Sequence, residues 1–351
     1  MRDNSKNEGD ATSLRTDEVL RISELTTTIS SPKGSMKAVS DLSLSVRKGE
    51  IVAIVGESGS GKSITCKSIM GSIESPARIE DGRALFETRS GHVIDLFATS
   101  DKVLRDLRGN EVALIPQDPT SSLNPVLTIG TQLNEVAQRH LRVTRRAAQQ
   151  ISAEALRRVG ISDPELRLKQ YPHELSGGMR QRVLIGLALT CKPTLLIADE
   201  ATTALDTTIQ AQILQLINKL RGNSDAMGVL FVTHDMGVAA EVGDRVVVMY
   251  AGRIVESGPA REVLSSPLHP YTIGLLGSTP KAEFDMQGTS LRKRIDTIPG
   301  MAPDPYALPA GCAFSPRCSF AEPQCREAVP KLSSLPGQRQ ISCIRWQEIA
   351  E

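Results

Sequence analysis

The chain has 351 residues, with 41 Lys plus Arg against 40 Asp plus Glu and a formal net charge of +1. This balance lacks the cationic field of a general nucleic-acid binder, so we expect no nucleic-acid partner. The polar N-terminus lacks the apolar core of a signal peptide, and no apolar run approaches the roughly 18 residues of a membrane-spanning helix. The sequence therefore predicts a cytosolic protein of two or three sub-domains.

The pattern of apolar residues predicts an α/β fold. Residues 1–18 are polar and are expected to form a disordered arm, after which short alternating segments lead to the apolar strand IVAIVG at 51–56. Helix-like stretches separate the later strand-like runs, which is the rhythm of an α/β sheet with antiparallel segments at its edges. These runs cover residues 112–115, 194–199, 228–235 and 245–256.

Two further regions differ from this core. Residues 128–175 carry apolar residues at helical spacing, which predicts an inserted helical sub-domain within about 118–180. Its arginines form either a solvated helix face or a surface that meets a membrane partner. After about residue 265 the chain becomes proline-rich and irregular, so we expect a separate C-terminal appendage over 266–351 and a core domain over 19–265.

The segment GESGSGKS has the spacing of a phosphate-binding loop and lies between a strand and a helix, as that loop requires. Glycines let backbone N–H groups point inward, and the following helix places its positive end at the ligand. Lys62 is expected to bridge the β and γ phosphates of a nucleotide, and the Ser63 hydroxyl to help hold Mg²⁺. The predicted phosphate-binding residues are Gly56, Glu57, Ser58, Gly59, Ser60, Gly61, Lys62 and Ser63.

A second apolar strand, TLLIADE, delivers two acids to its exit. Asp199 is expected to hold the magnesium, and Glu200 to polarise a water for in-line attack. Paired acids could also be a solvated strand end, but the phosphate loop upstream favours the catalytic interpretation.

The segment LSGGMRQR at 175–182 resembles the signature of the ABC ATPases. Ser176, Gly177 and Gly178 open a helix and form a second anion-binding corner. In the family, the signature of one subunit closes over the nucleotide held by the phosphate loop of another. The resemblance therefore implies a head-to-tail dimer with ATP at the interface, and a P-loop NTPase core with an antiparallel β sub-domain, an inserted helical sub-domain and a C-terminal extension.

Other family elements follow in the expected order. Gln117 in IPQDP resembles the Q-loop, Asp206 in TALD the D-loop, and His234 in VTHD the switch histidine. Each is weak alone, since Gln117 could be a turn residue and His234 a satisfied strand-end histidine, but the ordered set favours the family roles. By resemblance, Gln117 senses Mg²⁺ and water, and His234 contacts the γ-phosphate beside Glu200 and Lys62.

Within the ABC family the chain looks like the ATPases of oligopeptide and dipeptide importers, a class that includes nickel and glutathione uptake. The similarity spans about residues 20–345, through QDPTSSLNPVLTIG, HPYT at 269–272 and the C-terminal cysteines. It implies a second, different ATPase subunit, two transmembrane permease subunits, an extracytoplasmic solute-binding protein and a peripheral position on the cytoplasmic face of the inner membrane. Nickel, glutathione or another solute remains an alternative cargo.

A non-transport ABC ATPase acting on nucleic acid is the alternative of a different class. Such proteins separate the phosphate loop from the signature with long heptad coils or other large insertions. Here only residues 64–174 lie between them, so this alternative is disfavoured.

Two positions depart from the family pattern. Ile29 lies where an aromatic residue usually stacks on adenine, so we expect weaker stacking. Pro116 replaces an aromatic residue before the Q-loop glutamine; proline lacks an N–H and fixes φ, which predicts a stiffer Q-loop and altered coupling.

Four cysteines gather near the C-terminus, at Cys312, Cys318, Cys325 and Cys343. A reducing compartment makes disulfides the less favoured use. Some related importers carry a [4Fe–4S] cluster at such positions, and four thiolates also suit structural Zn²⁺. The spacing matches neither ferredoxins nor zinc ribbons, so cluster, zinc and unliganded thiols all stay open.

Overall fold

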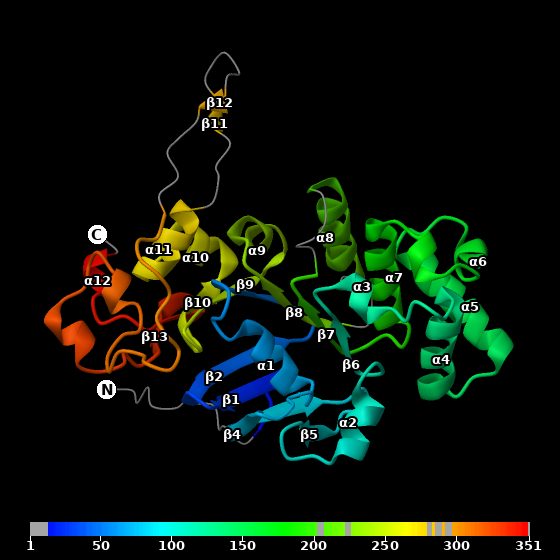
Figure 1. The fold of residues 1–351 in the computed structure, drawn as a ribbon, viewed down its shortest axis with the longest axis horizontal. Coiled ribbons are helices and arrows are strands. Elements are labelled where there is room, and N and C mark those ends of the chain that lie inside the picture. Colours follow the sequence, from blue (N-terminus) through cyan, green and yellow to red (C-terminus); the bar gives the residue numbers. More distant parts are fainter. Residues whose placement is uncertain are drawn as a thin grey trace, which may run out of the picture.

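The computed structural model describes residues 13–201, 207–221, 226–278, 283–284, 290–291 and 297–349. Two sheets organise these residues: an eight-stranded sheet across the middle of the molecule and a four-stranded antiparallel sheet on one side of it (Figure 1). Most helices lie on the opposite side of the larger sheet or at its end. The predicted α/β class with antiparallel segments is confirmed.

The centre of the larger sheet is parallel, in the order β9-β3-β8-β7-β6. Every residue of the third and eighth strands is buried, because parallel strands are covered on both faces and therefore consist of continuous apolar runs. The five parallel strands are β3 (Ile51–Val55), β6 (Val112–Ile115), β7 (Leu195–Asp199), β8 (Gly228–Thr233) and β9 (Arg245–Tyr250). The next strand, β10 (Arg253–Pro259), pairs antiparallel with β9.

The smaller sheet has the order β2-β1-β4-β5. Its strands bury apolar side chains such as Leu20, Ile22 and Leu25 in one cluster with Val52 and Ile54 of β3, so the two sheets share a core. The strands are β1 (Glu18–Ser31), β2 (Gly34–Arg47), β4 (Ala77–Glu87) and β5 (Val93–Asp95).

Helices gather at one end of the larger sheet, where Thr128 and Thr144 cap two of them by accepting N–H bonds from the first turn. This end contains α3 (Pro119–Ser122), α4 (Ile129–Leu141), α5 (Arg145–Arg158), α6 (Pro164–Arg167) and α7 (Gly177–Leu189). The remaining helices are α1 (Lys62–Ile69), α2 (Asp101–Leu107), α8 (Thr207–Arg221), α9 (Met236–Val242), α10 (Ala260–Ser265), α11 (Pro270–Gly277) and α12 (Trp346–Ile349). Within the described residues, no helix combines the length and the apolar character needed to cross a membrane.

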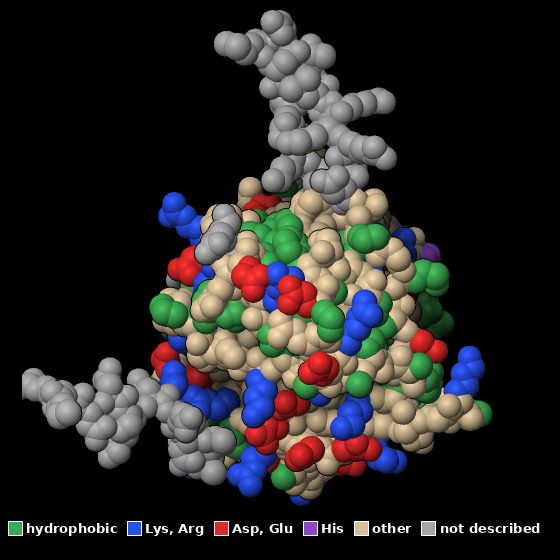
Figure 2. All heavy atoms as spheres, turned by 90° about the vertical axis from the view of Figure 1, so that its left-hand side faces the viewer, with side chains coloured by type: hydrophobic (Ala, Val, Ile, Leu, Met, Phe, Trp, Pro, Cys, Tyr) green, Lys and Arg blue, Asp and Glu red, His purple; other side chains and the backbone are tan. Residues whose placement is uncertain are grey.

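The C-terminal region, which the sequence predicts as an appendage over 266–351, adds two strands to the edge of the central sheet. β14 (Arg339–Ile341) pairs antiparallel with β10, and β13 (Ser333–Leu335) pairs with β14. Two very short strands, β11 (Glu283–Phe284) and β12 (Ser290–Leu291), pair only with each other in the sheet order. On the face that the C-terminal region covers, basic and acidic side chains are interspersed (Figure 2).

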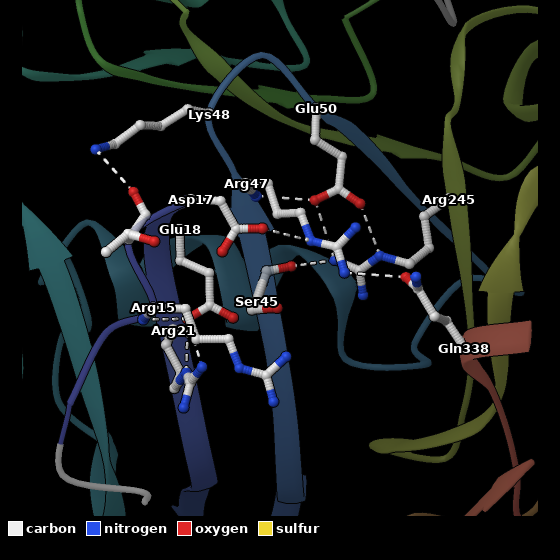
Figure 3. Close-up of polar contacts among 11 residues, drawn as sticks. Arg15, Asp17, Glu18, Arg21, Ser45, Arg47, Lys48, Glu50, Arg245 and Gln338 are labelled. Carbon is white, nitrogen blue, oxygen red and sulfur yellow. Dashed lines mark hydrogen bonds and ion pairs between the residues drawn. The ribbon is translucent and has the colours of Figure 1, made fainter. Parts of the chain in front are cut away.

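A polar network joins the sheets at the start of β3. The Arg245 guanidinium pairs with Glu50 at 2.8 Å, with both side chains largely buried, and Arg47 donates to Gln338 of the C-terminal region at 2.9 Å. Figure 3 shows Glu50, Arg47 and Arg245 converging where β2, β3 and β9 meet. Residues far apart in the sequence are thereby held together at the base of the sheet.

Candidate functional site

The loop from Gly56 to Gly61 connects β3 to α1 and depends on glycine at two positions. Gly56 has φ 155°, and a Cβ there would lie 2.2 Å from the Met249 carbonyl oxygen. Gly61 has φ 102°, and a Cβ there would lie 2.5 Å from the Ala38 carbonyl oxygen. No other residue fits such close backbone approaches, so the loop is held tightly against β2 and β9.

Lys62 is the cation at the centre of the loop. Its Nζ donates to the carbonyl oxygens of Gly56 at 2.8 Å and Glu57 at 3.0 Å. The side chain is 4% exposed, and this burial lowers its pKa, opposed by the charges of Glu200 and Asp199. A dianionic or polyanionic ligand at the loop would strengthen the charged form further.

Two carboxylates lie at the end of β7, close to this lysine. The Ser63 hydroxyl donates to Asp199 Oδ1 at 3.1 Å, and burial raises the pKa of Asp199. Glu200 has a left-handed backbone with φ 48°, an uncommon conformation for this residue type. Oxygen donors from a hydroxyl and a carboxylate fit Mg²⁺, which takes few protein ligands and keeps its other positions for phosphate oxygens and water.

Gln117 and His234 meet the same glutamate. Gln117 Nε2 donates to Glu200 Oε2 at 3.1 Å, and His234 Nδ1 lies 3.5 Å from that oxygen. Gln117 follows β6 and His234 follows β8, the strands on either side of β7. The carboxyl ends of adjacent parallel strands therefore bring together the side chains that the sequence predicts to act on one water and one phosphate.

A cavity of about 520 Å³ opens beside the phosphate loop. Gln117 and Glu200 line it, and so does Ile29 of β1, which the sequence predicts to lie at the base. Ser176, whose hydroxyl accepts the Met179 N–H at the start of α7, is not among the lining residues, and neither are Gly177 and Gly178. The predicted D-loop residue Asp206 lies outside the described residues.

The sequence reasoning missed a second set of residues at this cavity, which come from the C-terminal region. Arg317 binds both carboxylate oxygens of Glu57, at 2.8 and 3.0 Å, and the Tyr271 hydroxyl accepts the Glu57 backbone N–H at 2.7 Å. The HPYT segment was a visible signal, but neither spacing nor periodicity tells which loop it contacts. The residues of this region that line the cavity itself are Ala302, Pro303, Pro305 and Leu308, whereas Arg317 and Tyr271 contact the lining residue Glu57.

The four C-terminal cysteines line one small cavity of about 20 Å³, the size of one or two water molecules. Burial raises the pKa of Cys343 to about 11 and raises the pKa values of Cys312 and Cys318 as well. Among the described residues no three His, Cys, Asp or Glu side chains are grouped so as to hold a metal ion. In this arrangement the thiols do not form a ligand set for a metal or cluster.

Comparisons with known proteins agree with this geometry. Residues 39–203 match the ABC transporter family model, and residues 255–325 match the model of the oligopeptide/dipeptide transporter C-terminal region. The chain is 51% identical to a peptide import ATP-binding protein of Brucella melitensis over 95% of this chain and 98% of the relative. It is 44% identical to the dipeptide transport ATP-binding protein DppD of Bacillus subtilis, over 95% and 97% of the two chains.

Solved structures lead to the same family. A dimeric ATP-binding cassette in a post-hydrolysis state with ADP and Pi aligns with a TM-score of 0.61 and 26% identity, covering 69% of this chain and 99% of the cassette. A cassette of an ABC transporter complex from Clostridium perfringens aligns with a TM-score of 0.59, covering 71% and 91%. The chain therefore belongs to the family of ABC transporter ATP-binding subunits that have the oligopeptide/dipeptide transporter C-terminal region.

Proposed function

We propose that this chain binds and hydrolyses MgATP as the energising subunit of an ABC importer for di- and oligopeptides. The observation that carries the proposal is the convergence of Gln117 and His234 on one oxygen of Glu200, beside the buried Lys62 and the Ser63–Asp199 pair. The peptide cargo rests on the relatives, which are described as peptide, dipeptide and oligopeptide transport proteins.

The phosphate loop binds the nucleotide. Its inward N–H groups and the N-terminus of α1 hold the triphosphate, and Lys62 exchanges its two carbonyl partners for phosphate oxygens. Ser63, Asp199 and Gln117 are the residues that hold Mg²⁺, which when bound neutralises charge on the phosphates.

Hydrolysis is a displacement at the γ-phosphorus. A water oxygen attacks in line, the bond between the γ-phosphorus and the bridging oxygen breaks, and ADP leaves with that oxygen. Glu200 orients the water and accepts its hydrogen bond or proton, while Gln117 and His234 fix the position of the carboxylate.

We infer that the active assembly is a head-to-tail dimer with a second, different ATPase subunit. The signature residues Ser176, Gly177 and Gly178 do not line the cavity of their own chain, which supports a role at another subunit's nucleotide. Two transmembrane permease subunits and an extracytoplasmic solute-binding protein complete the complex, which places this chain on the cytoplasmic face of the inner membrane. The same machinery with nickel, glutathione or another solute as cargo is the alternative.

The test is uptake of labelled di- and oligopeptides by cells in which this subunit is deleted. We expect uptake to be lost, restored by the wild-type chain and not restored by Glu200→Gln, which retains MgATP but does not turn it over. Unchanged peptide uptake in the deletion strain rules out peptide import by this subunit. Nickel and glutathione uptake in the same strains separates the alternative cargoes.

The cysteine prediction has a test of its own. The alternatives are a [4Fe–4S] cluster, Zn²⁺ and unliganded thiols; the thiols line one cavity but are not grouped there as metal ligands, so binding of a cluster or of Zn²⁺ requires them to move. Ligation requires the thiols to lose their protons. Anaerobically purified protein that is colourless and without iron removes the cluster, and zinc analysis separates the other two.

A further inference from the structure

The cavity beside the phosphate loop has two apolar walls. One comes from the β1–β2 hairpin and includes Ile29 and Met36, which are paired across the two strands. The other comes from the C-terminal region, in a segment that passes beside the tip of this hairpin (Figure 1). Its lining residues are Ala302, Pro303, Pro305 and Leu308.

Apolar side chains that face an open cavity are suited to a flat, weakly polar ligand group. Leu308 is 37% exposed here, and a ligand that covered it would gain by removing apolar surface from water. The volume of about 520 Å³ is in the range of small-molecule sites, and the phosphate loop at the same cavity fixes where a triphosphate must lie. The part of a nucleotide left to occupy the apolar walls is its nucleoside.

Arg317 ties the second wall to the phosphate loop. Its Nε donates to the Pro299 carbonyl oxygen at 3.0 Å while its other nitrogens hold the Glu57 carboxylate. The side chain is 7% exposed and lies against the rings of Tyr250 and Phe314, about 6 Å from each centroid. With nearly all its donors used, this arginine fixes the start of the wall segment relative to the loop.

We propose that residues 302–308 of the C-terminal extension cover the adenosine of ATP opposite Ile29, and that Arg317 is the positioning residue for this wall. The proposal rests on the ATP site proposed above and adds a specificity-determining surface to it. Because Ile29 supplies no aromatic ring, the extension provides apolar contact that β1 alone does not. The C-terminal extension is thereby part of the nucleotide site.

The test compares a ligand that has a nucleoside with one that lacks it. MgATP and magnesium tripolyphosphate are titrated into the full-length chain carrying Glu200→Gln, which prevents turnover. Leu308→Ser is expected to weaken MgATP about tenfold and to change tripolyphosphate by less than about twofold, since only the nucleoside loses its contact. Val329→Ser is the matched control, because Val329 is an apolar residue of the same extension with 39% exposure and lies outside the cavity lining.

A double-mutant cycle tests the positioning role. In an Arg317→Met background the wall is no longer held, so Leu308→Ser should weaken MgATP by less than about threefold instead of tenfold. Arg326→Met, at an exposed arginine of the extension, should leave the tenfold effect intact. A purely structural role of Arg317 would lower stability without changing the cost of Leu308→Ser.

The outcomes are distinct. The proposed wall is wrong if Leu308→Ser weakens the binding of both ligands equally, or does not weaken MgATP binding. The positioning role of Arg317 is wrong if Leu308→Ser still weakens MgATP binding tenfold in the Arg317→Met background. If the parent chain binds neither MgATP nor tripolyphosphate, the proposed function itself fails. A preference for MgATP that disappears only in the wall variants supports the proposal.

Discussion

At the scale of single residues, we predict that Ile29 limits how tightly the base of the proposed nucleotide is held. It is partly buried on β1 and lines the nucleotide cavity without an aromatic ring. We predict that Ile29→Trp strengthens MgATP binding about fivefold, because an aromatic ring adds about 1 kcal/mol of stacking. Titration of the Glu200→Gln chain measures this, with tripolyphosphate as the ligand that should not respond. An unchanged or lower ATP affinity would show that position 29 does not contact the base.

His269 makes stability depend on pH. It is fully buried at the start of α11, its Nδ1 accepts the Tyr271 N–H, and burial lowers its pKa from 6.5 to about 3. Below about pH 6.5 the unfolded chain therefore binds a proton at this histidine that the folded chain does not bind. The contribution of neutral His269 to the free energy of unfolding is complete above about pH 6.5 and is lost as the pH falls towards 3.

Between pH 7 and pH 5 we expect this histidine alone to cost about 2 kcal/mol of unfolding free energy. Urea titrations at the two pH values measure the loss. His269→Asn keeps an acceptor for the Tyr271 N–H but does not titrate, so its pH dependence should be smaller by that amount. The prediction fails if the two chains lose the same stability on acidification.

At the scale of elements, the carboxyl ends of the parallel strands could be predicted from the sequence. The runs at 51–55, 195–198 and 229–232 are continuously apolar, as buried parallel strands must be, and site residues follow each of them within two positions. Glu200 and His234 consequently meet because β7 and β8 are neighbours. The left-handed backbone of Glu200 could not be predicted, because its sequence neighbours contain no glycine or turn signal for it.

Pro116 stands where β6 ends and the Q-loop begins, one residue before Gln117. Proline fixes φ and donates no N–H, so this joint is stiffer than one with an aromatic residue. We predict that Pro116→Phe leaves MgATP affinity unchanged but alters transport-linked ATPase activity by about twofold or more, roughly 0.4 kcal/mol in the activation barrier. The assay compares turnover of the assembled transporter with and without peptide. Identical stimulation of the two chains would count against a coupling role for this proline.

At the scale of the whole molecule, the association of the C-terminal extension with the ATPase core is the feature that sequence reasoning could not reach. Arg317 and Glu57 are 260 positions apart, and the segment around Arg317 is irregular, so no period or spacing relates the two. The same holds for β13 and β14, whose three-residue strands carry no pattern of their own; β14 pairs with the edge of β10, and β13 pairs with β14. Motifs predict local chemistry, whereas these contacts depend on long-range packing.

A second link between extension and core is the ion pair of Glu256 on β10 with Arg339 on β14. Glu256 is 0% exposed, its distance to Arg339 is 2.6 Å, and it also accepts the backbone N–H groups of Leu268 and His269 ahead of α11. Removing the arginine leaves a buried carboxylate without its cation, which typically costs about 3–5 kcal/mol.

We therefore predict that Arg339→Met lowers the unfolding free energy by about 3 kcal/mol or more, whereas Arg326→Met, at an exposed arginine of the same extension, changes it by less than about 0.5 kcal/mol. Adding Glu256→Gln to Arg339→Met should restore part of the loss, because the neutral amide no longer needs a cation and its oxygen still accepts one of the two backbone N–H groups. Chemical denaturation of the four chains measures these differences. Equal stability of the Arg339→Met and Arg326→Met chains would mean that the buried pair does not hold the extension in place, and that β14 is bound to β10 by its backbone pairing alone.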